Sequence, residues 1–343
     1  MNSPFSQGHL ATSGGHEIYY AEFGNPKAPA AIVLHGGPGS RSDVSMLKWF
    51  NLARWRVVLF DQRGCGKSRP LGRLENNLPD DLIGDIECLR SSLRIDSWVV
   101  VGGSWGGYLG LAYAARHGVA VRHLVLRGVF LPSRLQMDWF FQHLRALVPQ
   151  AWDNLTEDMS DREKENVFLT LATRLLGNDT SQIAQTATSW GRYEDAITNV
   201  MMQRSQREKV NVRKTEQTEQ AEQAEQTEQA EQTEQTEQTE QAVKRRISKF
   251  RIQAHYLQHL GVRDLSVLAS ELRRVRCATT LIHGTHDWIC PPANASMAAR
   301  ELANAQIRWV EGGTHTTSDP LIRQALSETL ASIAEQGISA SGV

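Results

Sequence analysis

A serine between glycines lies where an expected buried strand meets an expected helix. Residues 99–103 read VVVGG, and Ser104 precedes a helical stretch from Trp105 to about His117. This G-x-S-x-G pattern predicts a nucleophile elbow, a strained turn that lifts the serine hydroxyl above the edge of a sheet. A serine that only caps the helix would give the same letters, but the strand before it and the helix after it favour a nucleophile.

A serine hydroxyl is a weak nucleophile that needs a base, and the base needs an orienting acid. After this kind of elbow the acid and then the histidine follow along the chain. Asp287 comes after the apolar run TTLIHG, and His315 comes after QIRWV. Both would lie at the carboxyl edge of a sheet, with Ser104. We therefore expect His315 as the base and Asp287 as its acid, with Glu311 as the next acid to test.

Acyl transfer also needs N–H donors for the negative oxygen that forms during the reaction. One donor is the backbone of Trp105, directly after the serine. The second is expected from HGGPG (35–39), which follows the apolar run 30–34, because glycines let a backbone approach the substrate closely. We expect Gly37 to be this donor, with Gly36 as the alternative.

The elements that must position these groups are read from the apolar pattern. Strands are expected at 16–23, 30–34, 55–60, 99–103, 123–130, 279–284 and 306–310, and helices at 79–94, 105–117, 266–274, 292–304 and 320–334. Such alternation predicts an α/β protein with a mostly parallel sheet and helices on both faces. Strand signals vanish between Leu131 and Leu265. We therefore expect a core made of residues 1–130 and 266–343, with an all-helical cap inserted at 131–265.

A low-complexity segment lies inside the expected cap. Residues 215–241 are nine consecutive TEQ or AEQ triplets between basic flanks. A three-residue period matches neither a helix nor a coiled coil, so no constant apolar stripe forms. We expect a solvated helix of roughly 40 Å or a disordered excursion, and favour a tolerated surface insertion over a partner-binding element.

Composition limits the class of protein. The 343 residues include 37 basic and 38 acidic side chains, for a formal net charge of −1, and 41% are hydrophobic. This balance excludes a broadly basic nucleic-acid-binding protein, and no apolar run reaches the ~20 residues of a membrane helix. The amino terminus lacks a secretory pattern, and the four cysteines have no metal-ligand spacing. We expect a cytoplasmic protein without metal, cofactor, membrane or nucleic-acid partner.

Together these motifs resemble the proline iminopeptidases, which are serine exopeptidases of the α/β-hydrolase fold. The matching stretches are HGGPG (35–39), FDQRGCGKS (60–68), GGSWGG (102–107), LVLRGVF (124–130) and the regions around Asp287 and His315. The resemblance covers most of the chain outside the repeat. It implies cleavage of a free N-terminal proline from short peptides, and a helical cap that supplies a proline pocket.

The resemblance also assigns substrate-binding residues to the cap. The segment WGRYE (190–194) resembles an aromatic-rich family segment that ends in an amine-binding glutamate. Glu194 would then hold the substrate's ammonium group, with Trp190 and Tyr193 beside it; a solvated or ion-paired helix carboxylate is the alternative for Glu194. The second acidic position of the family is Gln253 here. A neutral amide accepts a hydrogen bond but lacks the charge-assisted gain.

Three functions are weighed on this basis. The leading hypothesis is a serine aminopeptidase for small peptides with N-terminal proline, which forms an acyl-enzyme at Ser104 that water activated by His315 then hydrolyses. The runner-up is an esterase or amidase with altered cap specificity, motivated by Gln253. A non-catalytic binding protein of the same fold comes third, because the complete Ser, Asp, His order argues against it.

Overall fold

In residues 3–214, 234–261 and 263–339, which the computed structural model describes, eight strands form one sheet. Its spatial order is β1-β2-β4-β3-β5-β6-β7-β8. The bounds are β1 Ser6–Thr12, β2 His16–Gly24, β3 Ala30–Leu34, β4 Arg56–Phe60, β5 Trp98–Gly103, β6 Val121–Arg127, β7 Ala278–Gly284 and β8 Ala305–Val310. β1 and β2 pair antiparallel, and the other six strands run parallel. The carboxyl ends of these six strands therefore share one edge.

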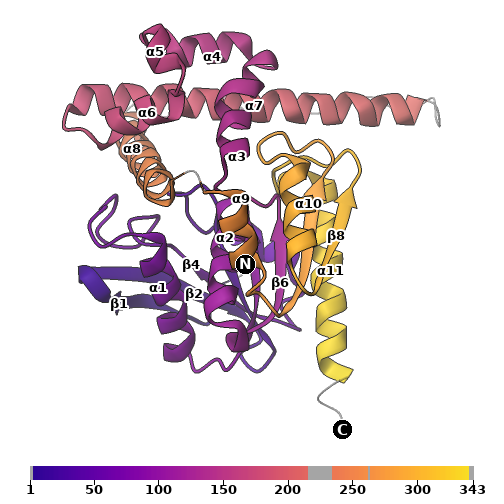
Figure 1. The fold of residues 1–343 in the computed structure, drawn as a ribbon. Coiled ribbons are helices and arrows are strands. Elements are labelled where there is room, and N and C mark those ends of the chain that lie inside the picture. Colours follow the sequence, from indigo (N-terminus) through magenta and orange to yellow (C-terminus); the bar gives the residue numbers. More distant parts are fainter. Residues whose placement is uncertain (1–2, 215–233, 262, 340–343) are drawn as a thin grey trace.

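Two groups of helices accompany the sheet (Figure 1). Those of the core are α1 Pro79–Ser92, α2 Trp105–Arg116, α9 Leu265–Leu272, α10 Pro292–Glu301 and α11 Pro320–Ser339. Those between β6 and α9 are α3 Arg134–Asp138, α4 Pro149–Thr156, α5 Asp161–Lys164, α6 Val167–Leu176, α7 Thr180–Lys214 and α8 Glu234–Leu260. The expected mostly parallel sheet with helices on both faces is confirmed.

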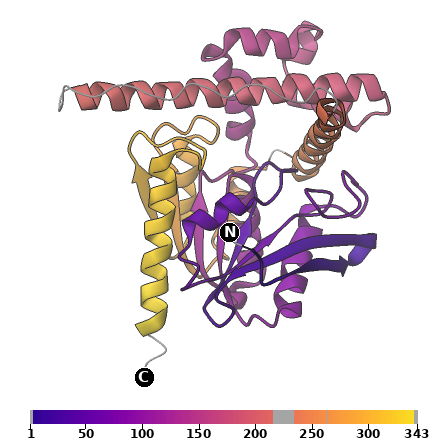
Figure 2. The ribbon, with the colours of Figure 1, turned by 180° about the vertical axis from the view of Figure 1, so that it is seen from behind.

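Both faces of the sheet are buried because alternate side chains of each strand point to opposite sides. Ile32 of β3 belongs to the apolar cluster formed with α1, α2, α9 and α10, whereas its neighbour Val33 belongs to the cluster formed with α11. Both side chains are 1% exposed or less. Figure 2 shows the molecule from the face that α11 covers, with this helix in yellow. The continuous apolar runs of the sequence therefore reflect strands that are covered on both sides.

The observed elements agree closely with those expected from the apolar pattern, with one addition. β3 occupies the expected residues, and β6 ends three residues earlier than expected, at Arg127. β1 was not predicted from the sequence. Its residues alternate between exposed and half-buried because it forms the outer edge of the sheet. An edge strand of this kind carries little apolar signal.

The segment between β6 and α9 has its own apolar centre. Among its described residues it contains helices and no strand, and Phe140, Phe141, Trp190, Tyr193 and Phe250 pack together in it. Figures 1 and 2 both show α7 running across the molecule above the core. We propose that residues 131–265 form the cap domain expected from the sequence.

The expectation for the TEQ/AEQ repeat falls mostly outside the described residues, because these omit 215–233. The last repeat residues, 234–241, are helical and begin α8.

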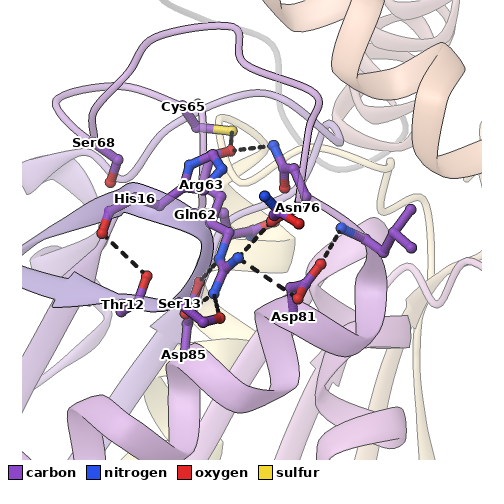
Figure 3. Close-up of polar contacts among 12 residues, drawn as sticks. Thr12, Ser13, His16, Gln62, Arg63, Cys65, Ser68, Asn76, Asp81 and Asp85 are labelled. Atoms are coloured by element: carbon purple, nitrogen blue, oxygen red, sulfur yellow. Dashed lines mark hydrogen bonds and ion pairs between the residues drawn. The ribbon is translucent and has the colours of Figure 1, made fainter.

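A buried ion pair fixes the loop that follows β4 (Figure 3). Arg63 is 1% exposed, and its Nε and Nη2 donate to the two carboxylate oxygens of Asp85 in α1 at 2.5 and 2.7 Å. The same guanidinium donates to the Asn76 carbonyl oxygen at 2.5 Å and to Ser13 Oγ at 2.8 Å. One side chain of the FDQRGCGKS motif thus ties α1 to the turn after β1.

Replacing Arg63 by methionine should lower the free energy of unfolding by about 3–5 kcal/mol, because Asp85 would remain buried without its cation. Urea denaturation of the full chain measures this change. The matched control is Arg134→Met, which removes an exposed Arg134–Asp138 pair and should cost less than about 1 kcal/mol. An equally small loss for Arg63→Met would contradict the structural role assigned to this pair.

Candidate active site

The backbone around Ser104 has the strained geometry of a nucleophile elbow. Ser104 lies between β5 and α2 with φ 55° and ψ −122°, a conformation that few residues other than glycine adopt. A methyl group at position 102 would lie 2.3 Å from the Gly106 carbonyl oxygen, and one at position 106 would lie 2.1 Å from that of Leu34. Both contacts are with backbone that cannot yield, so this turn requires its two flanking glycines.

His315 and Asp287 form a short buried hydrogen bond. His315 Nδ1 lies 2.7 Å from Asp287 Oδ2, and the two residues are 7% and 0% exposed. Because a carboxylate only accepts, the imidazole donates from Nδ1, which leaves Nε2 free to act as a base. The second oxygen, Oδ1, accepts the backbone N–H groups of Ile289 at 3.1 Å and Cys290 at 2.9 Å.

Electrostatics keep the Asp287 carboxyl group ionised. Burial alone would raise its pKa, but the charge and hydrogen bond of His315, with smaller contributions from His283 and the Cys290 N–H, lower the pKa below its usual value. The stability that Asp287 contributes is therefore present above the ordinary Asp pKa of about 3.9. It is lost as the pH falls through the lowered pKa.

Backbone hydrogen bonds hold together the two loops that carry this pair. The His286 N–H donates to the Gly313 carbonyl oxygen at 2.9 Å, and the Thr285 N–H donates to that of Val310 at 3.0 Å. A methyl group at position 284 would lie 2.2 Å from the Gly313 carbonyl oxygen, so this close approach needs Gly284. The loops after β7 and β8 therefore form one unit.

The end of β6 separates this pair from Ser104 and contacts both. The Ser104 N–H donates to the Arg127 carbonyl oxygen at 2.9 Å, and the Arg127 guanidinium donates to the His315 carbonyl oxygen. A methyl group at Gly128 would lie 2.8 Å from both Asp287 Oδ2 and His315 Nδ1. Ser104 and the pair thus meet at one edge, but in the described residues their side chains form no hydrogen bond to each other. Such catalytic contacts are often long in unliganded enzymes.

A small, mainly apolar pocket of about 60 Å³ opens on Ser104. It is lined by Gly37, Pro38, Ser104, Trp105, Phe130, Gln136, Met137, Phe140, Phe141, Trp190, Glu194, Gln253, Leu257, Ile289 and Cys290. This list brings together six residues expected from the sequence: Ser104, Gly37, Trp105, Trp190, Glu194 and Gln253. Core and cap residues both line the pocket, so it lies between the two.

Tyr193 lies in the centre of the cap rather than on the pocket wall. Its hydroxyl donates to the Phe140 carbonyl oxygen at 2.8 Å, and its ring packs edge-on against that of Phe140. Because Phe140 itself lines the pocket, Tyr193 supports the wall from behind.

Gln62 connects the two backbone segments that are expected to stabilise the oxyanion. Its N–H donates to His35 Nε2 at 3.0 Å, its side-chain amide donates to the His35 carbonyl oxygen at 2.8 Å, and its Oε1 accepts from Trp105 Nε1 at 3.0 Å. Burial lowers the pKa of His35, which keeps this imidazole neutral and able to accept. The sequence motif DQRG contained this residue, but its type alone did not indicate a positioning role.

The expected oxyanion donors are free to act. Gly37 and Trp105 line the pocket beside Ser104, and within the described ranges neither backbone N–H has an internal acceptor. Gly36 is also close, because a methyl group there would lie 3.5 Å from Ser104 Cβ.

Glu194 is ion-paired, as the alternative sequence interpretation had it. Lys249 Nζ lies 2.8 Å from Glu194 Oε2, and Gln253 Nε2 donates to Glu194 Oε1 at 2.8 Å. Lys249 was not predicted from the sequence. Its position four residues before Gln253, on the same face of α8, was the signal that could have found it.

The described residues hold no group of three or more His, Cys, Asp or Glu side chains that could bind a metal ion. None of the helices seen in these ranges is long and apolar enough to cross a membrane.

Comparisons with known proteins show which fold and which proteins this chain is similar to. A family model described as alpha/beta hydrolase fold matches residues 29–317. A probable proline iminopeptidase of Leptolyngbya boryana is 31% identical over 94% of the chain and 92% of its own length. A proline iminopeptidase of Arabidopsis thaliana is 32% identical over 94% and 78%. The crystal structure of proline iminopeptidase from Mycobacterium smegmatis superposes with a TM-score of 0.60 at 19% identity, covering 97% of this chain and all of that one.

Replacing Gln62 by leucine should slow the reaction of Ser104 with a fluorophosphonate by about 10- to 100-fold, because both oxyanion segments lose their common anchor. The rate of covalent labelling, followed by intact-protein mass spectrometry, measures this effect. The control is Gln306→Leu, which removes a side-chain hydrogen bond to Thr280 near the amino ends of β7 and β8, away from the carboxyl ends that carry the site. Equal labelling rates for both variants would contradict the positioning role of Gln62.

Proposed function

The chain belongs to the proline iminopeptidase family of α/β-hydrolase-fold enzymes, and we propose that it releases N-terminal proline from small peptides by acyl-enzyme catalysis. The observation that carries this proposal is the buried His315–Asp287 hydrogen bond at the strand edge that also carries Ser104 in a strained elbow. These residues would form a Ser–His–Asp triad.

In the proposed reaction His315 Nε2 removes the Ser104 proton as Oγ attacks the carbonyl carbon of the N-terminal residue. The tetrahedral intermediate collapses, the peptide C–N bond breaks, and the imidazolium gives its proton to the leaving amine. Water, deprotonated by His315, then attacks the acyl-enzyme, and Ser104 regains its proton as the free amino acid departs. Asp287 stays ionised throughout and stabilises the imidazolium.

The backbone N–H groups of Gly37 and Trp105 would bind the negative oxygen of both tetrahedral intermediates. Their availability and their place beside Ser104 support this assignment. Trp105 is the first residue of α2, so the partial positive charge of the helix terminus adds to the stabilisation.

The cap would select the N-terminal residue. The apolar pocket wall, including Trp190, suits a small ring, and Glu194 and Gln253 place hydrogen-bonding groups at the same pocket. Tyr193 would act on the ring only indirectly, through Phe140.

A second candidate function is an esterase or amidase with altered cap specificity. The Glu194–Lys249 ion pair favours it, because this pairing reduces the negative charge available for a substrate ammonium group. The chemistry at Ser104 would be the same in both functions.

Comparing the hydrolysis of prolyl-naphthylamide, alanyl-naphthylamide and a simple acetate ester tests the proposal. The proposed function predicts that the prolyl substrate has the highest kcat/KM of the two naphthylamides, and that Ser104→Ala abolishes its turnover. Turnover of the ester alone would contradict the peptidase function and would support the esterase function.

Replacing Asp287 by asparagine should lower kcat by about 10⁴-fold, the size of the effect in other Ser–His–Asp hydrolases, because the amide favours the wrong histidine tautomer. Steady-state kinetics on whichever substrate is turned over measures this loss. Asp264→Asn serves as a control, since Asp264 is an aspartate at the start of α9, where it accepts the backbone N–H of Ser266. A loss below tenfold in Asp287→Asn would remove Asp287 from the triad.

A further inference from the structure

The position expected to bind the substrate's amino group holds a carboxylate that is already occupied. Glu194 Oε2 pairs with Lys249 Nζ, and Glu194 Oε1 accepts from Gln253 Nε2, both at 2.8 Å. The two donors lie four residues apart on one face of α8. Both oxygens of Glu194 therefore have a partner before any substrate arrives.

Among the described residues, no second carboxylate lines the catalytic pocket beside Glu194. The Cys290 thiol is the other side chain of this pocket that could lose a proton and become negative. Burial raises the pKa of the Cys290 thiol well above its usual value, so the thiol is neutral.

Lys249 of the ion pair also lines a neighbouring cavity of about 360 Å³, together with residues of the loops after β3 and β4 and of α7. Its charged side chains are Arg41 of the loop after β3, Asp195 of α7, and Arg245, Arg246 and Lys249 of α8. An ammonium group beside Glu194 would thus meet a neutralised carboxylate in basic surroundings, which disfavours it.

One hydrogen-bonding atom of the subsite remains without a partner. Gln253 is 5% exposed, and its Nε2 is fixed on Glu194, so its Oε1 is an acceptor. This oxygen is buried and finds no hydrogen-bond donor among the described residues. A buried acceptor of this kind is satisfied by an N–H group of the ligand, and an uncharged N–H suffices.

We propose that Lys249 is a specificity-determining residue, which makes this subsite select an uncharged N–H donor instead of an ammonium group. The inference rests on the proposed function and narrows its substrate class. The preferred substrates are amides and peptides whose N-terminal residue is a five-membered ring with a weakly basic nitrogen, and prolyl substrates in their neutral-amine form.

The test compares prolyl-naphthylamide with thiazolidine-4-carbonyl-naphthylamide, whose ring has the same size but a much less basic nitrogen. At pH 7 the native enzyme should have at least as high a kcat/KM for the thiazolidine substrate. Its kcat/KM for the prolyl substrate should rise relative to the thiazolidine substrate as the prolyl amine loses its proton, near pH 8 for an ordinary α-amino group. The ratio cancels the titration of the catalytic groups, because both substrates share them.

Lys249→Met frees the Glu194 carboxylate and should reverse this preference. The prolyl substrate should gain about tenfold in kcat/KM at pH 7, the effect of one charge-assisted hydrogen bond, and that gain should vanish above pH 8. Lys249→Gln is a second variant in case the first folds poorly. The control is Lys244→Met, which removes an exposed lysine from the same helix. It should leave the ratio of kcat/KM for the prolyl and thiazolidine substrates unchanged at pH 7 and above pH 8.

Each outcome decides a separate point. A native enzyme that prefers the prolyl substrate tenfold at pH 7 and loses this preference above pH 8 contradicts the inference but keeps the proposed function. Unchanged ratios in both Lys249 variants also overturn the inference. Turnover of the thiazolidine substrate without turnover of the prolyl one at any pH contradicts the proposed function, and with it the inferred acceptance of the neutral prolyl amine. No turnover of either substrate, in protein that a fluorophosphonate still labels, contradicts both.

Discussion

The hydrogen bond between His315 and Asp287 is the interaction on which the proposed chemistry depends. The arrangement of the strands brings the two residues together. Neither loop reaches the other without the parallel pairing of β7 and β8, which ends both strands at one edge. Gly284 then allows the loop backbones to touch, and Gly128 leaves the space that the two side chains fill. Arg127 connects this unit to Ser104, because its guanidinium donates to the His315 carbonyl oxygen and its own carbonyl oxygen accepts the Ser104 N–H. Three distant parts of the chain are thus positioned through one strand end.

The core and the cap contribute differently to the site. The core holds its groups by buried contacts that leave little freedom, such as the bonds from Gln62 to His35 and Trp105. The cap places adaptable side chains over them, and Lys249 and Glu194 are each partly exposed, at 32% and 21%. A charge change in the cap can therefore alter which substrate is accepted without disturbing the bond-breaking chemistry.

Much of the core and its site could be predicted from the sequence, because local patterns report on them directly. The run VVVGG before Ser104 indicated a buried strand and a tight turn, and both are present. Contacts between distant segments left no such signal. The role of Gln62 depends on a histidine 27 residues away, and the Glu194–Lys249 pair depends on the crossing of α7 and α8. A glutamine, a glutamate or a lysine can play many roles in a protein. Only the packed structure shows which role each of these residues has.

The most direct test of the account is a crystal structure of the enzyme after reaction with a prolyl phosphonate, which mimics the tetrahedral intermediate. The account predicts phosphorus bonded to Ser104 Oγ, with His315 Nε2 in hydrogen-bond contact with an oxygen of the adduct. It also predicts a phosphoryl oxygen about 2.7–3.1 Å from the N–H groups of Gly37 and Trp105. An adduct on Cys290 or another side chain, or one on Ser104 with His315 turned away from it, would contradict the central claim.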